Sequence, residues 1–270
     1  MKKIVSIQDI SCYGQCSLTV ALPILSSFGI ETAILPSSIL STHTGGFTGF
    51  TIHDLTEEMP AIVNHWEKEH IRFDAIYTGY IGDARQFEII RHTRRLLNDG
   101  GQLLVDPAMA DNGKLYPALT EDIVEGMRTI VREADLILPN LTEAAFLLDE
   151  PYMETYSRDD IEGILKRLAA MGAKTVILTG VSYEEGKIGA VAYNSQTGKI
   201  DEYFTEKIEK NYHGTGDVFS SVAIAELLSG KDMPQILKSA CDFTVKSIKK
   251  TLPDPNHNYG VKFEAVLAER

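Results

Sequence analysis

The chain has 270 residues, of which 44% are apolar and 24% are charged, and its mean hydropathy is -0.08. These values exclude a disordered chain, a collagen-like chain and a disulfide scaffold, and they are typical of a globular protein. The formal net charge of -12 argues against a partner made of nucleic acid or anionic membrane, because both require clustered Lys and Arg.

No apolar run approaches the roughly 18 residues that a membrane span needs. Residues 1–11 lack the long apolar stretch of a signal peptide and predict a first strand. Three cysteines, Cys12, Cys16 and Cys241, are too few for a disulfide framework. Because free thiols are typical of a reducing compartment, we expect a cytoplasmic protein.

Strand-like runs alternate with segments of helical periodicity along most of the chain. In chain order, the sequence predicts a strand over 2–7, a helix over 17–29, a strand over 31–37, a helix over 59–70, a strand over 73–83, a helix over 84–101, a strand over 102–109, a helix over 121–134, a strand over 135–140, a helix over 158–172 and a strand over 174–180. An antiparallel pair follows over 188–208, and two helices follow over 217–230 and 234–251.

This order favours an α/β fold with a mainly parallel central sheet, helices on both faces and a small antiparallel pair late in the chain. No linker interrupts the pattern, so we expect one domain over residues 1–270. In such sheets ligands bind at the carboxyl ends of the strands, which directs attention to the polar residues there.

The segment HGTGD, residues 213–217, stands before an apolar helix. Glycines let the backbone approach a ligand closely, and amides at a helix N-terminus favour a phosphate. Asp217 would lie beside that phosphate, where a carboxylate can accept a proton from a hydroxyl during phosphoryl transfer. The alternative is that Asp217 only caps the helix.

Acidic and amide side chains stand at the ends of two predicted strands: Asp106 ends LLVDP, Asn140 ends DLILPN, and Glu143 lies three residues further on. Carboxylate oxygens suit a hard cation such as Mg²⁺, which keeps several waters. The alternative for Asn140 and Glu143 is a capped helix start.

Several motifs together carry a resemblance: SIQD near the start, STHTGG at 41–46, YTGYIGD at 77–83, VDPAMADNGKLY at 105–116, LPNLTEA at 139–145, ILTG at 177–180 and HGTGD. In this order and spacing the chain resembles the ribokinase-like superfamily, a three-layer sandwich, and within it the vitamin B6 kinases. The resemblance implies ATP-dependent phosphorylation of the 5′-hydroxymethyl group of pyridoxal, pyridoxamine or pyridoxine. It also implies ATP and Mg²⁺, a monovalent cation as a further option, and a homodimer.

The resemblance assigns roles residue by residue. Asp217 is similar to the catalytic base, and Gly214, Thr215 and Gly216 to the anion hole. Asp106 and Glu143 match the metal region, while Asn140, Thr179 and Gly180 match the nucleotide side. Thr44, Tyr80 and Tyr116 match positions around the pyridine ring. Asp9 and Ser11 are further candidates for the substrate side, although neither matches the family residue there.

Asp9 departs from the family pattern, because much of the B6 branch has Ser there. Ser11 shares a face with it in an extended segment and is a partial substitute. Asp9 can pair with a protonated ring nitrogen or with the amine of pyridoxamine, which predicts a preference for a cationic vitamer. The alternative is that Asp9 only caps or turns the loop.

Two rival functions stay open. A hydroxymethylpyrimidine kinase resembles the chain around HGTG but usually carries Cys where Asp217 stands, and its early D-x-S-G-G-A-G segment is absent. A non-catalytic B6-binding protein would keep the pocket without consuming ATP.

Overall fold

The computed structural model describes residues 1–117 and 119–269. Its strands are β1 (Lys3–Ser11), β2 (Glu31–Leu40), β3 (Ile52–Asp54), β4 (Phe73–Thr78), β5 (Leu97–Val105), β6 (Ala110–Asp111), β7 (Lys114–Leu115), β8 (Leu136–Ile137), β9 (Thr175–Val181), β10 (Lys187–Asn194) and β11 (Ile200–Glu206). Its helices are α1 (Leu18–Ser27), α2 (Met59–Lys68), α3 (Gln86–Thr93), the 3₁₀ turn η1 (Arg94–Leu96), α4 (Glu121–Val131), α5 (Leu141–Leu148), α6 (Arg158–Ala170), α7 (Thr215–Leu228), α8 (Met233–Thr251) and α9 (Phe263–Leu267).

One sheet runs through the described residues in the strand order β11-β10-β9-β8-β5-β4-β1-β2-β3. The strands from β9 to β2 pair in parallel, whereas β10 and β11 at one edge and β3 at the other pair antiparallel. The predicted mainly parallel sheet and the late antiparallel pair are therefore confirmed. A separate two-stranded hairpin of β6 and β7 was not predicted.

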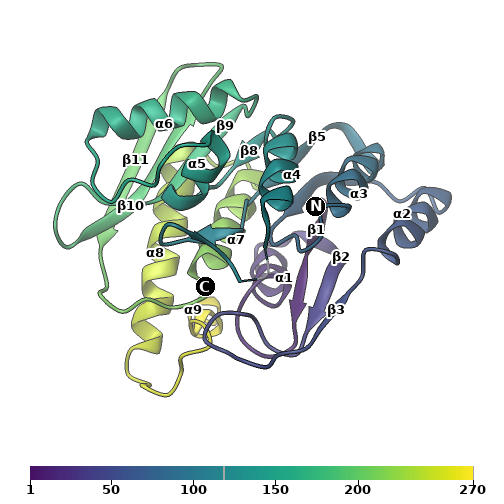
Figure 1. The fold of residues 1–270 in the computed structure, drawn as a ribbon, viewed down its shortest axis with the longest axis horizontal. Helices are drawn as coiled ribbons and strands as arrows, with labels where there is room; N and C mark the ends of the chain where they lie inside the picture. The colour runs from purple at the N-terminus through teal and green to yellow at the C-terminus, as the bar shows by residue number, and fades with distance from the viewer. Residues whose placement is uncertain (118, 270) are drawn as a thin grey trace.

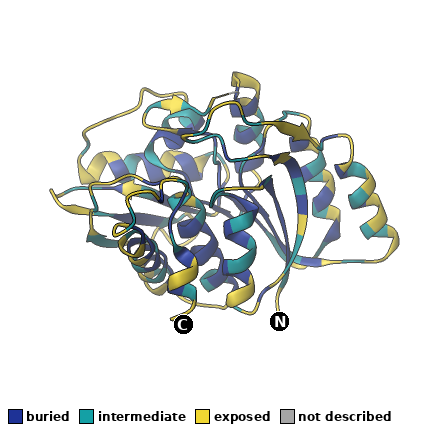
Figure 2. Ribbon diagram, turned by 90° about the horizontal axis from the view of Figure 1, so that it is seen from below, coloured by how far each residue is buried: buried dark blue, intermediate teal, exposed yellow. Residues whose placement is uncertain are grey.

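Helices cover both faces of the sheet (Figure 1), as the alternating pattern predicted. One apolar core joins the sheet to α2, α3, α4, α5 and α6, and the other joins it to α1, α7, α8 and α9. Figure 2 shows the central strands as a mostly buried layer between the helices. The predicted stripe of α6 illustrates the packing, because Ile161, Leu165 and Leu168 are fully buried.

The helix predicted over 84–101 was wrong in its second half. The α-helix ends at Thr93, and β5 begins at Leu97 after one 3₁₀ turn. Leu97 pairs with Phe73 of β4, so strand pairing overrides the local helix propensity of this segment.

Among the described residues, no helix is both long enough and apolar enough to cross a bilayer.

Candidate active site

The polar residues expected at strand ends lie along one edge of the sheet. Ile7 of β1 is level with Thr78 of β4, Thr78 with Val105 of β5, and Val105 with Ile137 of β8. Because these strands are parallel, the residues that follow them emerge on the same side. Asn140 extends this edge through an isolated bridge to Thr179 of β9.

The N-terminus of α7 forms a cradle for an anion. Gly214 caps the helix with a φ of 76°, and a Cβ there would lie 2.0 Å from the carbonyl oxygen of Gln15. Only glycine fits so close an approach. The helical ladder begins with the bond from the Val218 amide to the Gly214 carbonyl, so the amides of Thr215 and Gly216 precede it and suit a phosphate.

Asp217 stands in the first turn of α7 and is half-buried. Burial is the largest cause that raises the pKa of this carboxyl, to about 8, and the charges of Asp106 and Asp9 add to it. The amide of Ser17 donates a hydrogen bond to Asp217 and acts in the opposite direction. A carboxyl with its pKa near the working pH, beside an anion cradle, suits a general base.

Asp106 and Glu143 form a second pair of buried carboxyls. Burial raises the pKa of Asp106 to about 6, although the Ser220 side chain donates to it. Burial and the charge of Asp106 raise the pKa of Glu143 to about 8. Two neighbouring buried acids that both resist ionisation favour a bound cation.

Glu143 also has a structural role. One carboxylate oxygen accepts the Met109 amide at 3.1 Å, and the other accepts the Asn140 amide at 2.9 Å. In turn, the Asn140 side-chain oxygen accepts a hydrogen bond from the Glu143 amide at 2.9 Å, which completes a capping box at the start of α5. The interpretation as a capped helix start is therefore correct, and it is compatible with a cation held through water.

Within 1–117 and 119–269, no three His, Cys, Asp or Glu side chains gather tightly enough to hold a metal by themselves. The pair Asp106 and Glu143 fits Mg²⁺, which takes oxygen ligands and retains waters. When bound there, Mg²⁺ would neutralise charge on the phosphates of a nucleotide.

Asp9 lies deep at the end of β1, with only 4% of its surface exposed. The Ser11 hydroxyl donates to its carboxylate at 3.0 Å, and the Ser17 side chain also bonds to it. Burial raises the pKa of Asp9. The charge of Asp9 also acts on Tyr80, whose pKa burial raises to about 12.

Tyr116 follows β7 and is half-buried. Burial is the largest cause that raises the pKa of its phenol, and the negative charges of Glu143 and Asp217 raise the pKa further. This places Tyr116 in the field of the same carboxylates. On the nucleotide side, the Asn140 side chain donates to the Ala110 carbonyl at 2.8 Å. The Thr179 amide donates a hydrogen bond to the Pro139 carbonyl at 2.9 Å, and the next residue, Gly180, has a φ of 75°.

The loop between β2 and β3 carries Thr44. His43 anchors it, since one ring nitrogen accepts from the Gly45 amide at 3.2 Å and the other donates to the Tyr259 carbonyl at 3.1 Å. The ring of His213 lies against Gly45, so the loop packs next to the anion cradle. No described contact joins the Thr44 side chain to Asp217.

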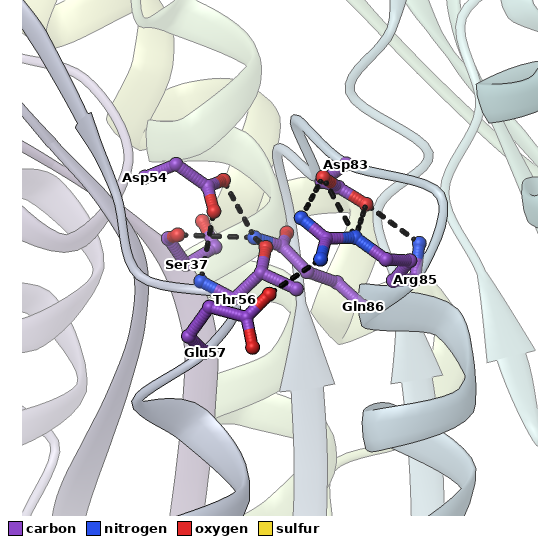
Figure 3. Close-up of polar contacts among 7 residues, drawn as sticks. All are labelled: Ser37, Asp54, Thr56, Glu57, Asp83, Arg85 and Gln86. Carbon is purple, nitrogen blue, oxygen red and sulfur yellow. Dashed lines mark hydrogen bonds and ion pairs between the residues drawn. The ribbon is translucent and has the colours of Figure 1, made fainter.

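A polar network ties β2, β3 and the turn after β3 to the start of α3 (Figure 3). Gln86 is fully buried, and its amide nitrogen donates to the Ser37 carbonyl at 3.0 Å and to the Thr56 hydroxyl at 2.8 Å. The Ser37 hydroxyl donates to the Tyr80 carbonyl at 3.3 Å. In the same view Arg85 joins Asp83 and Glu57. The network holds Tyr80 against β2.

The sequence did not point to Ser17, Ser220 or Gln86 as residues of the site. Ser17 and Ser220 contact Asp217 and Asp106. Both stand in segments that the sequence predicts as helices, and Ser220 follows HGTGD by three residues, but no pattern assigned either residue a role at the site. Gln86 sits in an apolar helical pattern, and a polar residue on that buried face was a signal for a network.

The fold and this edge of carboxylates define a small-molecule kinase of the ribokinase-like superfamily. A family model described as phosphomethylpyrimidine kinase matches residues 37–262. The chain belongs to this family, and within it is an enzyme of the pyridoxal kinase type.

Three similar proteins support this assignment. A Bacteroides thetaiotaomicron structure, provisionally named a phosphomethylpyrimidine kinase and in a crystal form with pyridoxal, is 38% identical with a TM-score of 0.95, covering 99% of this chain and 95% of that one. Pyridoxal kinase from Lactobacillus plantarum is 30% identical with a TM-score of 0.91, covering 100% and 96%. The pyridoxine/pyridoxal/pyridoxamine kinase of Bordetella avium is 26% identical over 266 residues, which are 92% of this chain and 85% of that protein.

Proposed function

We propose that the protein transfers the γ-phosphoryl group of ATP to the 5′-hydroxymethyl group of a vitamin B6 vitamer. The observation that carries this proposal is Asp217, a carboxyl with its pKa raised to about 8, in the first turn of α7 beside the Gly214 cradle. The vitamer-bound relative from B. thetaiotaomicron supports the choice of substrate.

In the proposed reaction, the Asp217 carboxylate accepts the proton of the 5′-hydroxyl. The hydroxyl oxygen forms a bond to the γ-phosphorus, and the bond from that phosphorus to the bridging oxygen of ADP breaks. The amides of Gly214, Thr215 and Gly216 stabilise the phosphoryl oxygens during transfer. Asp106 and Glu143 would hold Mg²⁺ near those phosphates, and a monovalent cation is a further option.

The remaining site residues divide between the two substrates. We propose that Asn140, Thr179 and Gly180 line the nucleotide side. The vitamer side would be lined by Asp9, Ser11, Thr44, Tyr80 and Tyr116.

Asp9 directs the choice among vitamers towards a cationic one. Its buried carboxylate receives hydroxyl bonds from Ser11 and Ser17, which compensate only part of the cost of burying a charge. A protonated ring nitrogen or an amine would supply the rest. Asp9→Ser should therefore lower kcat/KM for pyridoxamine relative to pyridoxine by about tenfold, which is the effect of roughly 1.4 kcal/mol. Unchanged vitamer ratios would restrict Asp9 to holding its own loop.

Hydroxymethylpyrimidine is the second candidate substrate, because the matched family is named for phosphomethylpyrimidine. It is also a flat ring with a hydroxymethyl group. Asp217, where such kinases usually carry Cys, favours the B6 vitamers. In a non-catalytic B6-binding protein, Asp217 and the Gly214 cradle would have no role, and this favours the kinase over the binding protein.

We also propose that residues 1–270 work as one domain in the cytoplasm, as a homodimer without nucleic-acid or membrane partners. The exposed side chains of Ile34, Ile39 and Ile52 give the β2–β3 edge an apolar face that a second copy could cover. Sedimentation equilibrium measures the state directly.

ADP release by the purified protein tests the function, with pyridoxal, pyridoxamine, pyridoxine and hydroxymethylpyrimidine as separate substrates. Turnover of the B6 set supports the proposal. Turnover of the pyrimidine alone would assign the enzyme to that substrate, and vitamer binding without ADP release would favour the binding protein.

A further inference from the structure

Ser17, between β1 and α1, has a backbone conformation that is unusual for any residue with a side chain. Its φ is 54° and its ψ is -131°, and it is 6% exposed. Glycine adopts this region without a steric penalty, whereas a Cβ makes it strained. Strain of this kind persists only where surrounding contacts enforce it.

Three other described residues besides glycine have a positive φ, and they differ from Ser17. Asn112 lies in the tight turn between β6 and β7, and Asp149 ends α5 in the left-handed helical region. His70 follows α2 on the surface. Ser17 alone among these four is buried.

The segment 14–17 packs between the anion cradle and Asp9. The Gln15 carbonyl occupies the place where a Cβ on Gly214 would go. The Thr19 hydroxyl donates to the Cys16 carbonyl at 2.8 Å, which fixes the turn before α1. The Ser17 carbonyl accepts the amides of Val20 and Ala21 at 3.0 and 2.9 Å.

The other polar groups of Ser17 point to the two sides of the site. Its amide donates to the carboxylate of Asp217, and its hydroxyl bonds to the carboxylate of Asp9. In an unstrained conformation the peptide between Cys16 and Ser17 would turn, and the amide would leave Asp217.

We propose that Ser17 is a positioning residue whose left-handed backbone conformation aims its amide at Asp217 and its hydroxyl at Asp9, so that base and vitamer site are held in register. The inference rests on the proposed function, because it gives Asp217 and Asp9 their roles.

Two substitutions separate the amide from the hydroxyl. Ser17→Gly keeps the backbone conformation and the amide but removes the hydroxyl, so kcat should stay within about threefold while KM for the vitamer rises several-fold. Ser17→Ala also removes the hydroxyl but keeps the Cβ. The bond to Asp9 then no longer offsets the backbone strain, so the peptide between Cys16 and Ser17 should turn. Its kcat should fall at least tenfold. His70→Gly and His70→Ala are matched controls at a surface position, and both should keep wild-type kcat and KM.

Melting temperatures and crystal structures of the two Ser17 variants supply readouts that need no turnover. Ser17→Gly should melt above Ser17→Ala, and only the alanine variant should show a turned peptide with Asp217 displaced. Equal kcat in both variants, or an alanine variant with an unchanged peptide, would overturn the inference. If the wild type phosphorylates no tested alcohol, the proposed function fails, while melting order and peptide orientation still decide for or against Ser17.

Discussion

Replacing Asp217 by Asn separates the catalytic role of this side chain from its cost to stability. The change keeps shape and leaves an oxygen to accept the Ser17 amide, but it removes the base. Loss of a general base typically lowers kcat by about 10²–10⁴-fold. We expect that loss for Asp217→Asn with a fold that stays intact.

The same variant should be more stable than the wild type. Burial raises the pKa of Asp217 from 3.8 to about 8, so in the folded protein the carboxyl holds a proton that it releases on unfolding. The wild type therefore loses stability as pH rises between about 4 and 8, at up to about 1.4 kcal/mol per pH unit. Asn does not titrate, so the melting temperature of the variant should exceed that of the wild type by an amount that grows over this pH range. Each kcal/mol of stability that the wild type loses should add about 3 °C to the difference.

Melting curves at pH 5, 6, 7 and 8, together with ADP release at pH 8, measure both effects. Glu209→Gln, which removes an exposed carboxyl nearby in the sequence, is the matched control and should change neither quantity. Wild-type turnover in Asp217→Asn would refute the assignment of the base. A difference in melting temperature that does not vary with pH would refute the account of its burial.

Two further substitutions test the parts around this residue. Gly214→Ala places a Cβ 2.0 Å from the Gln15 carbonyl at a positive φ, so it should abolish most turnover and destabilise the fold by about 1–3 kcal/mol, as seen by kcat and urea unfolding; full activity would mean that the cradle does not depend on this approach. Gln86→Leu removes the buried donor to Ser37 and Thr56, so it should raise KM for the vitamer and leave KM for ATP unchanged. Equal changes in both constants would show that the network serves general stability and not the placement of Tyr80.

The sequence was informative where local pattern and topology agree. Buried strands followed by polar residues predicted the edge at which Asp106, Asn140 and Thr179 gather, because parallel strands align their carboxyl ends. The helix predicted over 158–172 was expected to end at its glycine. In the structure Gly172 has a φ of 140°, and a Cβ there would lie 2.2 Å from the Arg132 carbonyl oxygen.

The sequence was uninformative where distant segments decide the outcome. Leu97 becomes a strand residue only because β4 lies next to it. The strained conformation of Ser17 depends on α7 and β1, which are far apart in sequence. The raised pKa values of Asp217 and Glu143 likewise follow from burial that no motif encodes.

The position of the transferred phosphate tests directly whether the protein phosphorylates the 5′-hydroxymethyl group of a vitamer. After incubation with ATP, Mg²⁺ and pyridoxamine, the product is analysed by mass and by phosphorus–proton coupling, with Asp217→Asn as the control. We expect one phosphate on the 5′-oxygen, formed in equal amount with ADP and absent in the variant. ADP formed without a phosphorylated vitamer, or the same product from the variant, would contradict it.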